Sequence, residues 1–255
     1  MWRKISSGLI LTGLALLMGV LPVAAQRPVQ DHPQPGDVIY HETFDAAFDD
    51  PDQRVANGWD TWSQGDMDKC ESSPCPVHSP EYKQSNPVNA FPERAQGGWG
   101  NAQQWFTVYA SHFAGISTQV AVPRGAEIEV SGWASAWSTS SDNPSAETSP
   151  MQMAIGVDPN GGNDPLSPSV VWGDEINPPN VDWAQLPPAE TTVGLNGRVT
   201  IFVRSAPMWP NKHNDVYVDN IHIIYQGRAV PTIEQTDPDE PATATLEAES
   251  GVSGK

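Results

Sequence analysis

Residues Ala126–Ser138, with the sequence AEIEVSGWASAWS, decide the fold class of this chain. Every second residue is apolar or small: Ile128, Val130, Gly132, Ala134 and Ala136. The residues between them are Glu129, Ser131, Trp133, Ser135 and Trp137. Successive side chains of a β-strand point to opposite faces of the sheet. The stretch therefore predicts a strand with one buried face and one mixed face that carries large rings among polar groups.

Eight further runs have the same character, and each is bounded by Gly, Pro, Asn or Asp. They are Val38–Phe44, Gln103–Tyr109, Gly115–Val122, Met151–Val157, Ser169–Trp172, Asp182–Leu186, Arg198–Ser205 and Asp215–Tyr225. Helical periodicity is essentially absent from this part of the chain. The pattern predicts an all-β fold, an antiparallel β-sandwich or jelly roll.

The first 25 residues have the order of a secretory signal peptide. Arg3 and Lys4 precede an apolar run from Gly8 to Leu21, and small residues lead to an expected cleavage after Ala25. The run is short for a bilayer span, although an uncleaved anchor is the alternative. We therefore expect a secreted protein that works outside the cell or at its surface.

Composition divides the rest of the chain into three parts. Residues 26–36 form a polar lead-in, and residues 37–226 hold almost all aromatic and β-branched residues. Residues 227–255 are acidic and rich in Thr and Pro, which is typical of a disordered tail or linker. We expect a monomeric sandwich domain followed by such a tail.

The formal net charge of −18 narrows the choice of partners. A surface this acidic repels phosphate backbones and anionic lipid. Nucleic acid and membrane insertion are therefore not expected, whereas neutral polymers and divalent cations are compatible with this charge.

Cys70 and Cys75 are the only cysteines, and they lie in a stretch rich in Pro and Ser. In an exported protein this spacing predicts a local structural disulfide. The alternative is a zinc site that adds His78, for which the sequence offers no evident fourth ligand.

The mixed face of Ala126–Ser138 is the predicted binding site. Sugars stack their C–H faces on aromatic rings, and Trp133 and Trp137 stand about 13 Å apart on an ideal strand. The polar residues expected beside them are Glu129, Ser131, Ser135 and Gln152. The alternative is that residues 56–102 or 139–150 cover both rings, which then form a second small core.

Motifs for catalysis are weak. His213 and Asp215 resemble part of a catalytic triad, but a histidine bonded to a neighbouring carboxylate is the commoner arrangement. A glycosidase needs two facing carboxylates, and no pair is singled out among the 31 acidic residues. The oxygen-rich segment Asp158–Asp164 lacks EF-hand spacing and is predicted to be a Gly-rich turn.

Several segments resemble the galactose-binding-domain-like jelly rolls, which include many carbohydrate-binding modules and occur in cell-surface proteins beside LysM modules. The resemblance covers most of Asp37–Tyr225 and implies carbohydrate binding. The matching segments, in order, are Phe44-Asp45, Asn101–Tyr109, Ser131–Ser138, Gly156–Gly162, Val170–Trp172 and Lys212–Asn220.

The resemblance also implies a structural calcium ion between the first and last strands. It points to Asp45 and Asp219 as ligands, and Glu42 with backbone carbonyls would complete the set. The family usually has Glu where this chain has Asp45, so the carboxylate reaches less far here.

Three functions follow in order. The leading hypothesis is a secreted, non-catalytic domain that binds extracellular polysaccharide or cell-wall glycan. The second is a structural or adhesion domain of the cell envelope. The third is a glycoside hydrolase or polysaccharide lyase that uses Glu129 with another acid on the mixed face.

Overall fold

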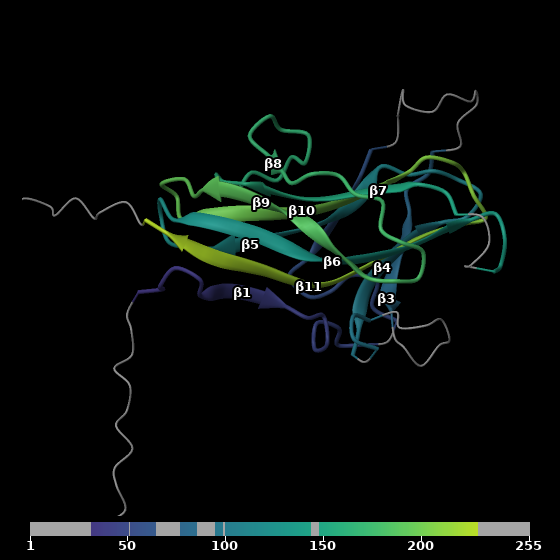
Figure 1. Ribbon diagram of the computed structural model, residues 1–255, viewed down its shortest axis with the longest axis horizontal. Helices are drawn as coiled ribbons and strands as arrows, with labels where there is room; N and C mark the ends of the chain where they lie inside the picture. Colours follow the sequence, from purple (N-terminus) through teal and green to yellow (C-terminus); the bar gives the residue numbers. More distant parts are fainter. Residues whose placement is uncertain are drawn as a thin grey trace, which may run out of the picture. The chain divides into compact units, whose positions relative to one another are not determined.

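Two antiparallel sheets pack face to face in the computed structural model, which describes residues 32–50, 52–64, 77–85, 95–98, 100–143 and 148–228 (Figure 1). Sheet A contains β1 (Val38–Glu42), β3 (Glu81–Ser85), β4 (Ala102–Thr107), β6 (Glu127–Thr139), β9 (Ala184–Thr192) and β11 (His213–Gly227). Sheet B contains β2 (Asp60–Ser63), β5 (Ala114–Ala121), β7 (Met151–Asp158), β8 (Val171–Trp172) and β10 (Arg198–Pro207). The predicted all-β sandwich is confirmed.

The strand order is that of a jelly roll. Sheet A runs β3-β4-β11-β6-β9, with β1 also paired to β11, and sheet B runs β2-β5-β10-β7-β8. From β4 to β11 the chain crosses from one sheet to the other at almost every step, and β7 to β8 is the exception. Every pairing between these strands is antiparallel.

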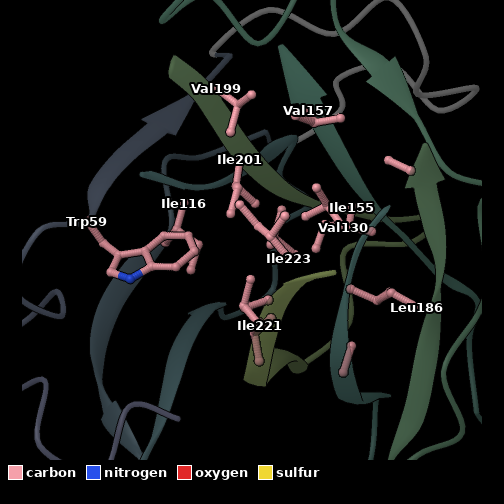
Figure 2. Close-up of a cluster of buried hydrophobic side chains, with 14 of the residues drawn as sticks. Trp59, Ile116, Val130, Ile155, Val157, Leu186, Val199, Ile201, Ile221 and Ile223 are labelled. Carbon is pink, nitrogen blue, oxygen red and sulfur yellow. The ribbon is translucent and has the colours of Figure 1, made fainter. Parts of the chain in front are cut away.

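The core lies between the sheets and follows the alternation of the strands. Val130 of β6, Ile155 of β7, Ile201 of β10 and Ile223 of β11 are buried and meet there (Figure 2). Each comes from the apolar set of its strand, so the prediction of which face is buried is correct.

All nine predicted strands are present, and two more were not predicted. β2 and β3 fall within residues 56–102, which were expected to be loop, and both pair at an edge of a sheet. β3 has the sequence EYKQS, with a single ring to bury, so apolar alternation does not reveal it.

One extra residue in β11 changes which side of the strand is buried. The pairing of β11 with β6 shifts between Asp219 and His222, and Asn220 has φ 50°. This β-bulge lets Val216 and Val218 before it, and Ile221 and Ile223 after it, all face the core.

None of the described residues forms a helix that is long and apolar enough to cross a membrane. The expected signal peptide, the two cysteines and the tail beyond Arg228 lie outside the described residues, as does most of the polar lead-in.

Candidate functional site

The outward side of sheet A carries most of the residues expected at the site, as alternation in β6 predicts. Glu129 and Trp133 are half-buried, and both alternate with core residues of β6. Trp133 stands opposite Gln185 of β9 and Asp219 of β11. We call this surface the sheet A face.

Trp137 does not present the open ring that was expected. Its indole stacks on the imidazole of His213, with ring centroids 3.9 Å apart and an interplanar angle of 8°. Only 7% of Trp137 is exposed. Asp215 is the direct partner of Trp137 in β11, and His213 is its diagonal neighbour, within reach of a large ring.

Trp133 differs from Trp137 because no ring or cation of the described residues stacks on it. The serines beside it are buried and take structural roles. Ser131 Oγ donates a hydrogen bond to the carbonyl of Leu186 (2.9 Å) and accepts one from Gln185 Nε2 (3.2 Å). Ser135 is also buried, so neither hydroxyl is displayed at the surface of the face.

A polar pocket of about 590 Å³ lies along β6, and its nearest lining residue of that strand, Glu129, is four residues from Trp133. Its lining residues are Glu127, Ile128, Glu129, Glu190, Thr191, Thr192 and Gln226. Glu129 and Glu190 are direct cross-strand partners, and Gln226 Nε2 donates to Glu129 Oε2 (2.9 Å). Ionised carboxylates only accept hydrogen bonds, so this pocket suits a ligand rich in hydroxyl donors.

Sequence reasoning missed Glu190 because β9 was expected to end at Leu186, and it missed Gln185 and Gln226 because alternation does not tell which strands lie beside β6. The strand continues through Pro187-Pro188 to Thr192. Proline is tolerated there because β9 is an edge strand, and its register against β6 shifts across the two prolines.

Gln152 is not part of this face. It lies on β7 of sheet B, where its direct partner is Ala206, and its side chain is exposed. The expectation that Gln152 stands beside Glu129 and Ser131 is therefore wrong. Alternation placed it on the polar side of its strand but did not tell which sheet the strand joins.

His213 lies between two carboxylates, as expected for a structural histidine. Its Nε2 is 2.9 Å from Asp142 Oδ1, and its Nδ1 is 3.7 Å from Asp215 Oδ2. Lys212 Nζ binds the same Asp142 oxygen at 2.6 Å. The cluster is a histidine held between two carboxylates, one of which also pairs with a lysine.

A serine–histidine pair does exist, in the core. His112 Nε2 lies 2.8 Å from Ser205 Oγ, which also accepts a hydrogen bond from Trp105 Nε1 (2.7 Å). Thr107 Oγ1 donates to the carbonyl of Ala110, so it accepts from His112 Nδ1 (3.0 Å). Burial lowers the pKa of His112 to about 3. A neutral, enclosed and fully bonded imidazole is a structural link between β4 and β10, not a general base.

The three residues expected to bind calcium lie in one region of the fold. Burial raises the pKa of Asp219 to about 7, and the negative charges of Asp45 and Glu42 add to the effect. Gly100 leaves room for Asp45, since a Cβ at Gly100 would stand 1.8 Å from Asp45 Oδ1. Asp219 is buried, Glu42 is half-buried and Asp45 is exposed. Carboxylates that repel one another suit a divalent cation.

The positions of these carboxylates do not form a coordination shell. The amide N–H groups of Gln96 and Asn220 donate to the two oxygens of Asp219, at 3.0 and 2.7 Å. Glu42 Oε1 and Asp45 Oδ1 likewise accept amide hydrogens. No group of three His, Cys, Asp or Glu side chains among the described residues is arranged to hold a metal. The charge fits calcium, whereas the observed geometry does not.

No family model and no curated protein matches this chain. Among solved structures it is similar to TmCBM61 in complex with β-1,4-galactotriose, at 17% identity, over 66% of this chain and 88% of that one, with a TM-score of 0.42. It is also similar to the CBM22-1–CBM22-2 tandem domain of Paenibacillus barcinonensis Xyn10C, at 13% identity and TM-score 0.46, over 77% of this chain and 48% of that one. A xylan-binding domain from CBM22 matches at 13% identity and TM-score 0.41, over 78% and 100%. Likeness at this level does not assign a function to this chain.

Proposed function

We propose that this protein is a secreted, non-catalytic domain that binds extracellular polysaccharide or cell-wall glycan through the sheet A face. The observation that carries the proposal is the half-buried indole of Trp133, on which no described ring or cation stacks, on the same strand face as Glu129, which lines the polar pocket. Such a ring accepts the C–H face of a sugar, and the pocket accepts its hydroxyl hydrogens.

The distance between Trp133 and Glu129 agrees with the length of a short stretch of a glycan. Trp133 and Glu129 are four residues apart on one strand, about 13 Å along an extended backbone. Gln185 lies beside Trp133, and Gln226 reaches Glu129, so amide groups stand at both ends of this distance. A net charge of −18 disfavours polyanionic glycans as ligands.

Retention on insoluble glucan, xylan and peptidoglycan tests the proposal. We expect Trp133→Ala to lose most binding and Trp133→Phe to keep part of it. Trp172→Ala is the matched control, because Trp172 is a half-buried indole on the outward side of sheet B. Unchanged retention of Trp133→Ala, with a native circular dichroism spectrum, would contradict the proposal.

Export is part of the proposal and rests on residues 1–25. The mature N-terminus, determined by mass spectrometry on protein from the culture medium, is expected at Gln26. The same measurement under non-reducing conditions tests the disulfide, because a Cys70–Cys75 bridge lowers the mass by two hydrogens.

Calcium binding is the remaining part and rests on charge. Asp45, Asp219 and Glu42 would hold the ion, which would offset their mutual repulsion and stabilise the folded state. We expect added Ca²⁺ to raise the melting temperature of the wild type but not of Asp219→Asn. Equal melting temperatures in Ca²⁺ and in chelator would remove calcium from the proposal.

A further inference from the structure

Exposed apolar side chains gather in two loops of this fold. Eight large apolar side chains are exposed among the described residues, and four of them belong to the β4–β5 and β10–β11 connections. These four are Val108 (54% exposed), Tyr109 (63%), Met208 (50%) and Trp209 (46%), which we call the end patch. The end patch lies off the sheet A face, because none of its residues belongs to a strand.

Hydrogen bonds fix the two loops to each other. The buried Asn214 donates from Nδ2 to the carbonyls of Ala110 (2.9 Å) and Trp209 (2.8 Å), one in each loop. The amide of Tyr109 donates to the carbonyl of Asn211 (2.7 Å). The rings of Tyr109 and Trp209 therefore stand on one preorganised support, which lowers the entropy cost of binding.

The backbone holds Tyr109 in a costly conformation. Its φ is 52°, in the left-handed region that residues with a Cβ seldom adopt. Strain of this kind persists only where surrounding contacts fix it, and it is common at binding sites. Here it accompanies a ring that is 63% exposed.

The loop that holds Trp209 also holds a charged hydrogen-bonding group, Lys212. Asp142, whose side chain is 73% exposed, binds both Lys212 Nζ (2.6 Å) and His213 Nε2 (2.9 Å). Lys212 is the last residue of the β10–β11 loop, and the hydrogen bond that it donates to Asp142 raises its pKa, with a smaller contribution from Tyr109. Exposed rings next to donors and acceptors are what a sugar requires.

We infer that the end patch is a second glycan-binding site, in which a saccharide stacks on Tyr109 and Trp209 and bonds to the Asp142–Lys212 pair. Four side chains from two short loops are few for a stable protein interface, which buries about 800 Å² on each partner. The net charge of −18 opposes anionic membranes and a second copy of this chain. The inference goes beyond the proposed function, because it requires neither Trp133 nor the polar pocket.

Amide and indole NMR spectra test the site directly. The probes are xylohexaose, cellohexaose and β-1,4-galactotriose, each titrated into the ¹⁵N-labelled domain. We expect at least one probe to shift the Trp209 indole and the Tyr109 amide. Trp209→Ala and Tyr109→Ala should each weaken that probe about tenfold, the effect of losing one stacked ring. Leu195→Ala, in the turn between β9 and β10, is the exposed apolar control.

The outcomes separate this inference from the proposed function. If Trp133→Ala still binds while Trp209→Ala does not, the end patch is supported and the sheet A face is contradicted. If only Trp133→Ala loses binding, or if no probe shifts Trp209, the end patch is overturned. A further outcome is retention on whole cell walls that depends on Trp209 and yet disappears after protease treatment of the walls. That result would show a protein ligand and would also overturn the glycan assignment of the end patch.

Discussion

The outward sides of the two sheets carry similar side chains that are used in opposite ways. On sheet B, the guanidinium of Arg204 lies 4.2 Å from the ring centroid of Trp172 and 5.7 Å from that of Phe113. Glu175 pairs with the same guanidinium at 2.5 Å. On sheet A, His213 stacks on Trp137, but no described residue stacks on Trp133.

The difference teaches that a tryptophan on a strand becomes a binding platform only when its cross-strand neighbours leave it free. On sheet B the small residue Gly156 lets Trp172 lie close to its strand, and a Cβ there would stand 2.5 Å from the indole. The rings of sheet B are thus covered by its own side chains, whereas sheet A leaves the ring of Trp133 without a described stacking partner.

The largest expected effect is a loss of folding stability at low pH, where protonation of His112 breaks the link between the two sheets. His112 joins Thr107 of β4 to Ser205 of β10. Its pKa falls from 6.5 to about 3 on folding, so the unfolded chain binds more protons. Stability is therefore full above pH 6.5 and decreases as the pH falls toward 3, by up to on the order of 4 kcal/mol.

Urea unfolding from pH 8 to pH 4 measures this slope. His112→Gln keeps hydrogen-bonding groups but does not titrate, so its own curve should be flatter in that range. A wild-type and a variant curve of the same slope would show that another group governs acid unfolding.

The next effect is the loss of stability when one glycine in each sheet is replaced by alanine. A Cβ on Gly115 of β5 would stand 1.7 Å from the backbone oxygen of Val203. On Gly132 of β6 it would meet the tip of Ile221 at 2.5 Å. We expect Gly115→Ala to cost about 3 kcal/mol and Gly132→Ala less, because a side chain can move and a paired backbone cannot. Thermal unfolding of both variants decides the order.

A smaller effect contrasts the two half-buried indoles. Trp172→Ala removes the support of Arg204 and uncovers Phe202, so we expect a loss of about 2 kcal/mol in the free energy of unfolding. Trp133→Ala should cost less than about 1 kcal/mol, because no described ring or cation stacks on it. Equal losses in urea unfolding would mean that Trp133 is also structural.

The smallest effect concerns the ion pair on sheet B. Glu175→Gln removes the charge that faces Arg204, and the Glu175 side chain is 46% exposed, so water partly screens the pair. Exposed pairs are worth under about 1 kcal/mol. The melting temperature of this variant should stay within a few degrees of the wild type at 0.15 M salt, and a larger fall would show that the pair holds Arg204 over the rings.

The fold was largely predictable because alternation is a local property. It located nine strands and the buried side of β6, β7 and β10. The bulge in β11 also left a signal that was not used: Val216 and Val218 are even-numbered, whereas Ile221 and Ile223 are odd-numbered. A change of parity within one apolar run indicates an inserted residue.

The site was less predictable because it depends on which strands become neighbours. His213 covers Trp137 from 76 positions away in the sequence, and only the register of β11 against β6 brings them together. The pairing of β7 with β10 likewise decides that Gln152 belongs to the other sheet. The prolines of β9 concealed the second half of that strand, which supplies Glu190.

Those prolines have another effect. Strands at the rim of a sheet can recruit further chains through their unpaired backbone N–H groups, which is how aggregates grow. At Pro187 and Pro188 two successive residues have no such donor, and at the rim of sheet B β8 is only two residues long. A rim interrupted in this way resists templated growth, so copies of this domain at high concentration are hindered from joining their sheets edge to edge.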